Sequence, residues 1–481
     1  MLPKKVKWFL IVLIALVVVT AIALIVTDAV FTSRLDDQLA RIADKGQPAT
    51  MEQLAPADIP AARNGAIELR RAMLMLPSVR GEDLEAMAIE GAPEGAVEPI
   101  ELTAEDDLWI DENLADRAAD VARHAPEDAR RIFDKLAPAL AVAEQGLEKE
   151  GCRFDLAYDD GLGMLLPHLM GLRHLARLFA LRGAVALRQG DVDAAIADVG
   201  RTMKLAQVID GEPLLISRLV GIAIEQLGAT LAQDIATEKA LTAKQAGALS
   251  DIFESRVSDR RMVDALIGER VFGLDAHEML RRGELSFDDI GQGGGKPVAL
   301  LRPILGPFVK ANAVVYLETM ADIVDAAGKP IGRFRAAFDE DKLTESIPGW
   351  AILPRLLIPA LTRAVEAEGR VQAILRSGAS AFAIAAEVNR DRDVDPKKSA
   401  PGGLAMVDPF TGKPLTIIKK DGSIAVYSVG TNLKDDGGGP YEDPHAREGY
   451  PLAWHYPPAP DEAVADDLGF TVRVKEKEPS E

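Results

Sequence analysis

One apolar segment near the amino terminus constrains this chain more than any other feature. The run from Trp8 to Thr27 contains no charged residue, and Lys4, Lys5 and Lys7 precede it. A helix needs about 20 apolar residues to cross a bilayer, and cytoplasmic flanks are enriched in Lys and Arg. We therefore predict that residues 1–34 hold a cytoplasmic basic tip and a single-pass anchor, with the rest of the chain on the extracytoplasmic, periplasmic side of the cell membrane.

A cleaved signal peptide is the alternative interpretation of this segment. Such peptides have a shorter apolar core followed by a small-residue cleavage site. The best cleavage candidate, around Ala21 to Ala23, lies inside the apolar run, and no cysteine near the run could accept a lipid. The pattern favours an anchor that is retained.

Charge and cysteine content exclude several classes of function. The chain has 55 Lys and Arg against 75 Asp and Glu, a net charge of -20. Binding to nucleic acid draws on dense positive charge, so we predict no nucleic-acid partner. Cys152 is the only cysteine, which excludes an internal disulfide and a cysteine-rich metal cluster.

The first part of the extracytoplasmic chain, residues 35–281, predicts a helical domain. Leu35, Leu39 and Ile42 recur at helical spacing and indicate a short stalk helix that Gly46 ends. Residues 126–256 are rich in Ala and Leu, strongly periodic and almost free of strand signals, as in packed antiparallel helices. The clearest helices run over 168–188 and 192–208, where Gly190 ends one helix and Asp191 caps the next. We expect a mostly α fold, either a bundle or a solenoid-like stack.

A second helical segment follows a glycine-rich linker at residues 282–297 and covers residues 298–390. Its apolar stretches are Val298 to Met320 and Trp350 to Val365, and the first is interrupted by charged residues and prolines. Those interruptions argue against further membrane spans. We expect core helices, with helices lying on the membrane surface as the alternative.

The carboxyl-terminal part predicts a small antiparallel β module at residues 405–475, after a polar linker at 391–404. Two β-rich runs, 415–420 and 423–429, flank Asp421-Gly422, a dipeptide typical of a two-residue hairpin. Phe470, Val472 and Val474 alternate with polar residues and indicate a third strand. Residues 476–481 are expected to form a disordered tail.

Candidate catalytic groups are sparse in this sequence. His277-Glu278 lacks the second histidine of a zinc protease helix, and no segment has the G-x-S-x-G spacing of a hydrolase elbow. Asp159 and Asp160 near His168 form an acid–base grouping if the fold brings them into one pocket. Adjacent acids before a helix also cap it, which explains the two aspartates without catalysis. We assign no catalytic residue.

A polar segment after the hairpin is the best candidate for a ligand site. Asn432, Asp435 and Asp436 lie close together and are followed by glycines. Calcium accepts carboxylates and main-chain carbonyls in flexible geometry, so these three residues form a candidate calcium site. A polar turn that holds no ion is the alternative, because Asp, Asn and Gly are also common turn residues.

The same region resembles a known family. Asp408-Pro-Phe-Thr-Gly-Lys-Pro414, the hairpin, Tyr427-Ser-Val-Gly and Asp435-Asp436-Gly-Gly are similar to the carboxyl-terminal region of the major pseudopilins of type II secretion. That resemblance implies calcium binding by Asp435 and Asp436, with Asn432 beside them. The chain lacks the short leader and the early Glu of pilin-like proteins, so the resemblance does not imply assembly as a pilin subunit.

Two further resemblances concern the helical part. One helical hairpin resembles a tetratricopeptide-type repeat at its packing positions, which are Phe179, Gly183, Gly190, Ala195 and Val199. Residues 30 to 275 resemble uncharacterised membrane-anchored proteins of planctomycete-type bacteria in the segments Asn64-Gly-Ala, Cys152-Arg-Phe, Tyr158-Asp-Asp-Gly, Leu166-Pro-His-Leu and Gly190-Asp191. The second resemblance implies an architecture but no activity.

Packed helices expose broad surfaces that suit protein or peptide binding. We therefore predict a membrane-tethered interaction or scaffold protein, associated with secretion or the cell envelope, whose protein partners the sequence does not identify. Two alternatives stay open: an extracytoplasmic hydrolase that uses an acid/His pocket, and a purely structural envelope protein.

Overall fold

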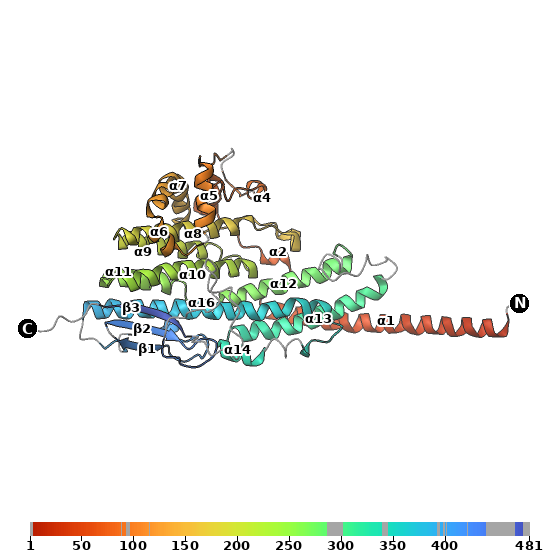
Figure 1. Ribbon diagram of the computed structural model, residues 1–481. Coiled ribbons are helices and arrows are strands. Elements are labelled where there is room, and N and C mark those ends of the chain that lie inside the picture. Colours follow the sequence, from red (N-terminus) through yellow and green to blue (C-terminus); the bar gives the residue numbers. More distant parts are fainter. Residues whose placement is uncertain are drawn as a thin grey trace, which may run out of the picture.

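The computed structural model describes residues 3–87, 89–92, 97–114, 116–285, 302–338, 345–391, 395–397, 400, 402–420, 422–438 and 467–474. These residues form a mostly helical protein with one small antiparallel sheet and a long amino-terminal helix, which confirms the predicted fold class in outline (Figure 1). The predicted linker after residue 285 and the predicted tail lie outside the described residues.

The first helix, α1, extends over Lys4–Asp44 and projects from one end of the body (Figure 1). No Gly or Pro interrupts its sequence, and it ends before Gly46, whose positive φ of 65° breaks the helix. Its apolar amino-terminal window is 0 % buried. The anchor and the stalk helix that we predicted as separate elements are therefore one continuous helix.

Short helices and the long α7 form the outer part of the body. Polar side chains fix several of their starts: the Thr103 hydroxyl accepts from the Asp106 backbone N–H in a full capping box, and Asn64 accepts from Ala66 N. The elements are α2 (Met51–Leu54), η1 (Ala61–Arg63), α3 (Ala66–Met75), α4 (Glu82–Ala86), α5 (Ala104–Asn113), α6 (Ala118–His124), α7 (Pro126–Leu147) and η2 (Tyr158–Gly163).

The middle of the body consists of α8 (Pro167–Arg188), α9 (Val192–Gln207), α10 (Leu215–Glu238), α11 (Ala243–Glu254) and α12 (Arg261–Arg282). The predicted turn between α8 and α9 is confirmed: Gly190 has a φ of 86°, and the Asp191 carboxylate accepts from Ala194 N at 3.0 Å. α8 packs on α9 and α10. A Cβ on Gly183 would approach Leu231 to 2.6 Å, so glycine permits the close contact of α8 with α10.

Two long helices and one short one complete the helical part: α13 (Arg302–Ala327), α14 (Ile331–Ala337) and α16 (Ile352–Arg390). α13 lies against α1 and α12, while α16 contacts α10, α11, α12, α13 and the sheet. Val314, Leu317 and Met320 of α13 are buried, as are Val371, Leu375 and Phe382 of α16. These faces form part of the core.

The sheet has the strand order β1-β2-β3, with β1 at Thr416–Lys420, β2 at Ser423–Ser428 and β3 at Leu468–Arg473. Both pairings are antiparallel, so the predicted hairpin and third strand are confirmed. Along β3, Phe470 and Val472 are buried. The Phe470 ring meets that of Phe253 edge-on, with centroids 5.1 Å apart, so the sheet shares a core with the helices.

Candidate functional site

Three ion pairs between described residues connect α1 to α13. Lys310 Nζ lies 2.8 Å from an Asp28 oxygen, and Arg34 contacts Glu318 at 2.7 Å. Farther from the amino terminus, Lys45 pairs with Asp325 at 3.0 Å. Residue numbers increase together along the two helices, so α1 and α13 run parallel. The half of α1 that follows the apolar run thus belongs to the body.

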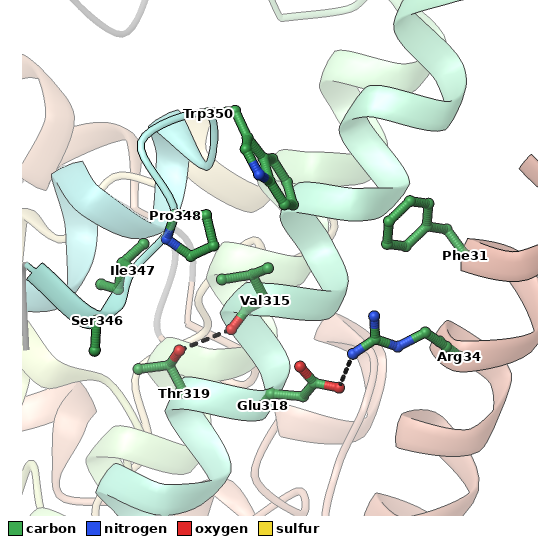
Figure 2. Close-up of a pocket in the computed structure, with 9 residues that line it drawn as sticks. All are labelled: Phe31, Arg34, Val315, Glu318, Thr319, Ser346, Ile347, Pro348 and Trp350. Atoms are coloured by element: carbon green, nitrogen blue, oxygen red, sulfur yellow. Dashed lines mark hydrogen bonds and ion pairs between the residues drawn. The ribbon is translucent and has the colours of Figure 1, made fainter. Parts of the chain in front are cut away.

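A groove of about 350 Å³ lies between α1, α13 and the segment that leads into α16 (Figure 2). Phe31 and Arg34 line it from α1, Val315 and Glu318 from α13, and Trp350 from just before α16. Trp350 is 44 % exposed although its ring is large and apolar. The groove is therefore a partly apolar site just beyond the apolar run of α1.

The predicted acid–base grouping is not formed by Asp159 and Asp160. Both aspartates are exposed on η2, whereas His168 is fully buried. The partner of His168 is Glu212, at 2.8 Å, and Ser217 donates to the other oxygen of that carboxylate at 2.6 Å. Ser217 thus donates its hydroxyl hydrogen to a carboxylate rather than to the histidine that a serine nucleophile would need.

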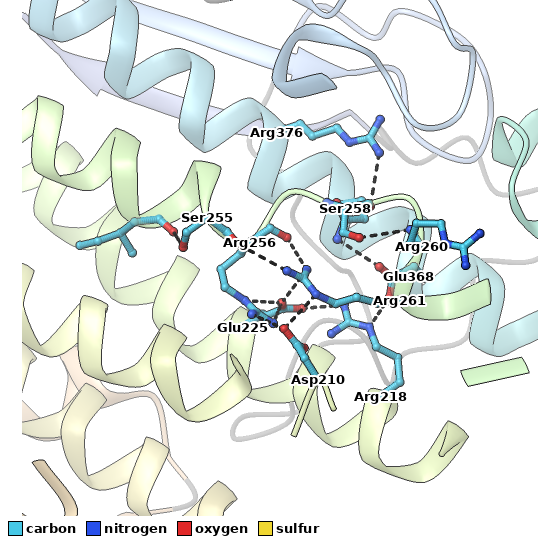
Figure 3. Close-up of polar contacts among 12 residues, drawn as sticks. Asp210, Arg218, Glu225, Ser255, Arg256, Ser258, Arg260, Arg261, Glu368 and Arg376 are labelled. Atoms are coloured by element: carbon cyan, nitrogen blue, oxygen red, sulfur yellow. Dashed lines mark hydrogen bonds and ion pairs between the residues drawn. The ribbon is translucent and has the colours of Figure 1, made fainter. Parts of the chain in front are cut away.

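An ionic network that the sequence analysis missed joins α10, α16 and the loops that precede α10 and α12 (Figure 3). The Glu225 carboxylate accepts from Arg218 and from Arg256, each at 2.7 Å. Arg218 also donates to Glu368 at 2.6 Å, and Arg256 makes two hydrogen bonds to Asp210. We call these five residues the buried ionic network, of which Asp210 forms the exposed edge.

The pKa values of the buried side chains in this network depend on their oppositely charged neighbours. Burial alone would raise the pKa of Glu225, but Arg218, Arg256 and Arg261 lower it to about 2. Opposite charges also raise the pKa of Arg218 against the effect of burial. Glu225 and Arg218 therefore stay charged inside the protein at neutral pH.

A pocket of about 210 Å³ lies beside the network, lined by the loop before α10 and by the first turns of α10 and α12. Asp210, Glu212, Arg218, Arg261 and Asp264 contribute charged side chains to its wall. The Arg218 Nη1 atom is buried and has no hydrogen-bond partner among the described residues. The wall thus carries both signs of charge and does not select an anion or a cation.

The carboxyl-terminal acidic loop follows β2. Asp435 accepts from the Tyr427 hydroxyl at 2.9 Å, and Asp436 accepts from Asn432 at 2.7 Å. The structure adds Asp467, immediately before β3, to the three predicted residues. One of its oxygens accepts from Asp436 N and Gly438 N, at 3.0 and 2.8 Å.

Asp467 is 1 % exposed, and its second oxygen, Oδ1, is buried with no partner among the described residues. Burial raises the pKa of Asp467, and the charges of Asp436 and Asp435 add to the rise. A calcium ion would relieve both effects by binding oxygen ligands of this kind. Within the described residues, however, no three His, Cys, Asp or Glu side chains are already gathered around one metal position.

No protein-family model, curated protein or solved structure matches this chain. Besides α1, one described helix is long and apolar enough to cross a membrane, namely α10, but 67 % of its apolar window is buried in the body. The site residues must therefore be interpreted from their own geometry. Glu212 and Asp467 carried no sequence signal, since Glu212 is far along the chain from His168 and Asp467 is far from the acidic loop.

Proposed function

We propose that this chain is a membrane-tethered extracytoplasmic interaction or scaffold protein of the secretion machinery or envelope, with α1 as its retained anchor. The observation that carries the proposal is the continuity of α1. Its first half is apolar and exposed, and its second half is packed on the body, where Ile42 is buried. Since the same helix serves both environments, the body is held close to the membrane surface.

An exposed apolar surface on the body supports an interaction role. Leu165, just before α8, is 63 % exposed, Met170 in the first turn of α8 is 65 % exposed, and Leu162 in η2 is 46 % exposed. Clustered apolar side chains on a surface are typical of protein contacts. In the proposed architecture, a solenoid-like stack of antiparallel helices presents this surface to a protein partner.

The tether is tested by fractionation of native membranes. We expect the unprocessed chain to stay in the membrane pellet after alkaline carbonate extraction, and added protease to digest the body only from the extracytoplasmic side. A chain shortened at its amino terminus and released as a soluble protein would contradict retention.

The interaction is tested by placing a photo-crosslinking amino acid at Leu165 or Met170 of the full-length protein in its native membrane. We expect one protein to be cross-linked from both positions. The matched control is Lys244, which is exposed on α11. Absence of cross-links from Leu165 and Met170, or an identical pattern from Lys244, would refute a partner at this surface.

A calcium ion bound by Asp435, Asp436 and Asp467, with Asn432 at the edge, is a second candidate function. The observation that favours it is the unpartnered Asp467 Oδ1 atom beside two more carboxylates. The ion would neutralise the repulsion of these acids and fasten the loop to β3.

Calcium binding to the folded form alone raises the melting temperature by mass action. We expect calcium to raise the melting temperature of the full-length protein in detergent, and Asp467→Asn, which keeps the size of the side chain, to abolish the rise. Asp155→Asn is the control, because this carboxylate pairs with Arg153 in the helical part. No rise at millimolar calcium would eliminate the site.

A further inference from the structure

The register of α13 against α1 determines how far the body reaches towards the membrane. Lys310 pairs with Asp28, the first residue after the apolar run of α1. α13 begins at Arg302, about two turns before Lys310, which is ~12 Å at 1.5 Å per residue. Because the helices are parallel, the first turns of α13 lie level with the last turns of the apolar run.

Neighbouring elements agree with this register. Figure 1 shows the amino-terminal end of α13 alongside α1, on the side towards the amino terminus of the chain. The carboxyl-terminal end of α12 lies at a similar level: the pKa of Arg281 is raised mainly by Glu278, and Asp28 adds a smaller contribution. Two elements of the body thus reach the end of the apolar run.

The chemistry of these turns suits a bilayer. Residues 302–309 contain one charged residue, Arg302, at the very start of the helix, and Phe308 is only partly buried by the protein. The remaining residues of these turns are apolar or glycine.

Two aromatic residues lie just beyond the apolar run of α1, on the side towards the body. Phe31 and Trp350 face the groove between α1 and α13 (Figure 2), and Phe31 is one turn beyond the apolar run. Tryptophan is enriched where a membrane meets water, because its ring is apolar and its N–H is polar. The half-exposed Trp350 therefore lies at the depth expected of the headgroup layer.

We propose that the amino-terminal turns of α13 dip into the leaflet on the body side of the bilayer, beside α1, and that Trp350 and Phe31 lie in its headgroup layer. The inference rests on the proposed retention of α1. A lipid surface is the favoured occupant because the contact is continuous with the span of α1. The protein is then attached by two elements, which orients the body as well as tethering it.

Tryptophan quenching by brominated lipids tests this inference on the full-length protein in vesicles. The chain has 4 tryptophans, at positions 8, 109, 350 and 454, so single-tryptophan proteins are made by changing the others to Phe. A further protein combines Phe308→Trp with removal of all four. Trp350 is native and requires no packing change at the tested position, and Trp109 in α5, on the far side of the body from α1, is the control (Figure 1).

We expect Phe308→Trp to lose fluorescence with lipids brominated along the acyl chain, Trp350 to lose it only with bromine near the headgroup, and Trp109 to be unaffected. If Trp8 is quenched but Trp350 and Phe308→Trp are not, α1 is embedded and the inference is wrong. If Trp8 is also unquenched, both this inference and the proposed anchor are wrong. Shielding of Trp350 that grows with protein concentration would assign the surface to a second copy and overturn the inference.

Discussion

The same ion-pair chemistry is used in two very different settings in this molecule. In the buried ionic network, the side chains of Glu225, Arg256 and Arg218 are 0 %, 1 % and 4 % exposed. Between α1 and α13, those of Arg34 and Glu318 are 48 % and 40 % exposed. The buried charges have lost their water and depend on each other, whereas the exposed ones remain solvated.

This contrast assigns different roles to the two sets. Removing one partner of a buried pair leaves an uncompensated charge in a medium of low dielectric constant, while an exposed pair contributes little to stability. We infer that the network controls whether the helices of the body stay together, and that the pairs along α1 control its register on α13.

Loss of the central carboxylate should have the largest effect. Glu225→Gln leaves Arg218 and Arg256 without their shared counter-charge, so we expect the free energy of unfolding to fall by about 3–5 kcal/mol. Urea unfolding of the full-length protein in detergent measures this change. The exposed Glu318→Gln is the control, and a loss of similar size in both variants would end the distinction between the two settings.

A buried imidazole should give an intermediate, pH-dependent effect that sharpens the comparison. Among the described residues, the hydrogen-bond partner of His277 is the Gly273 carbonyl oxygen, which supplies no counter-charge. Burial lowers the pKa of His277 to about 4 in the folded protein, against an ordinary value near 6.5. Below pH 6.5 the unfolded chain takes up the proton first, so stability falls as the pH drops from 6.5 towards 4.

The full loss from His277 is roughly 3 kcal/mol, at about 1.4 kcal/mol for each pKa unit. We expect the decline in melting temperature between pH 6.5 and 4 to be shallower in His277→Gln. Burial also lowers the pKa of His174 to about 4, so His174 contributes to the decline that remains in the variant. Equal declines in the variant and the parent would show that His277 takes up its proton without opposing folding.

The exposed pair should have the smallest effect. A double-mutant cycle of Arg34→Ala and Glu318→Ala is expected to give a coupling free energy of about 0.2–1 kcal/mol. Added salt should reduce it further, because mobile ions screen exposed charges. A coupling of several kcal/mol would place this pair with the network.

Local signals in the sequence predicted local structure well. The turn at Gly190 and Asp191 depends on neighbouring residues, and the alternation around Phe470 identified β3. The anchor and stalk were predicted as separate elements because the change from apolar to charged residues was taken as a boundary. Nothing in that sequence breaks a helix.

The candidate sites depended on contacts that local patterns do not encode. Arg218 and Glu225 lie two turns apart on one face of α10, so their presence in an apolar helix was a usable signal for a buried pair. Glu368, by contrast, comes from a helix much later in the chain. Asp467 is likewise distant in sequence from the acidic loop, and α13 is distant from α1.

The aromatic contact between the sheet and the helices joins residues that are synthesised at different times, because translation starts at the amino terminus. Phe253 of α11 and Phe382 of α16 both pack on Phe470 of β3, which is synthesised long after Phe253. Until β3 arrives, these rings lack the partner that covers them. A nascent chain therefore keeps this apolar site open until its last strand has been made.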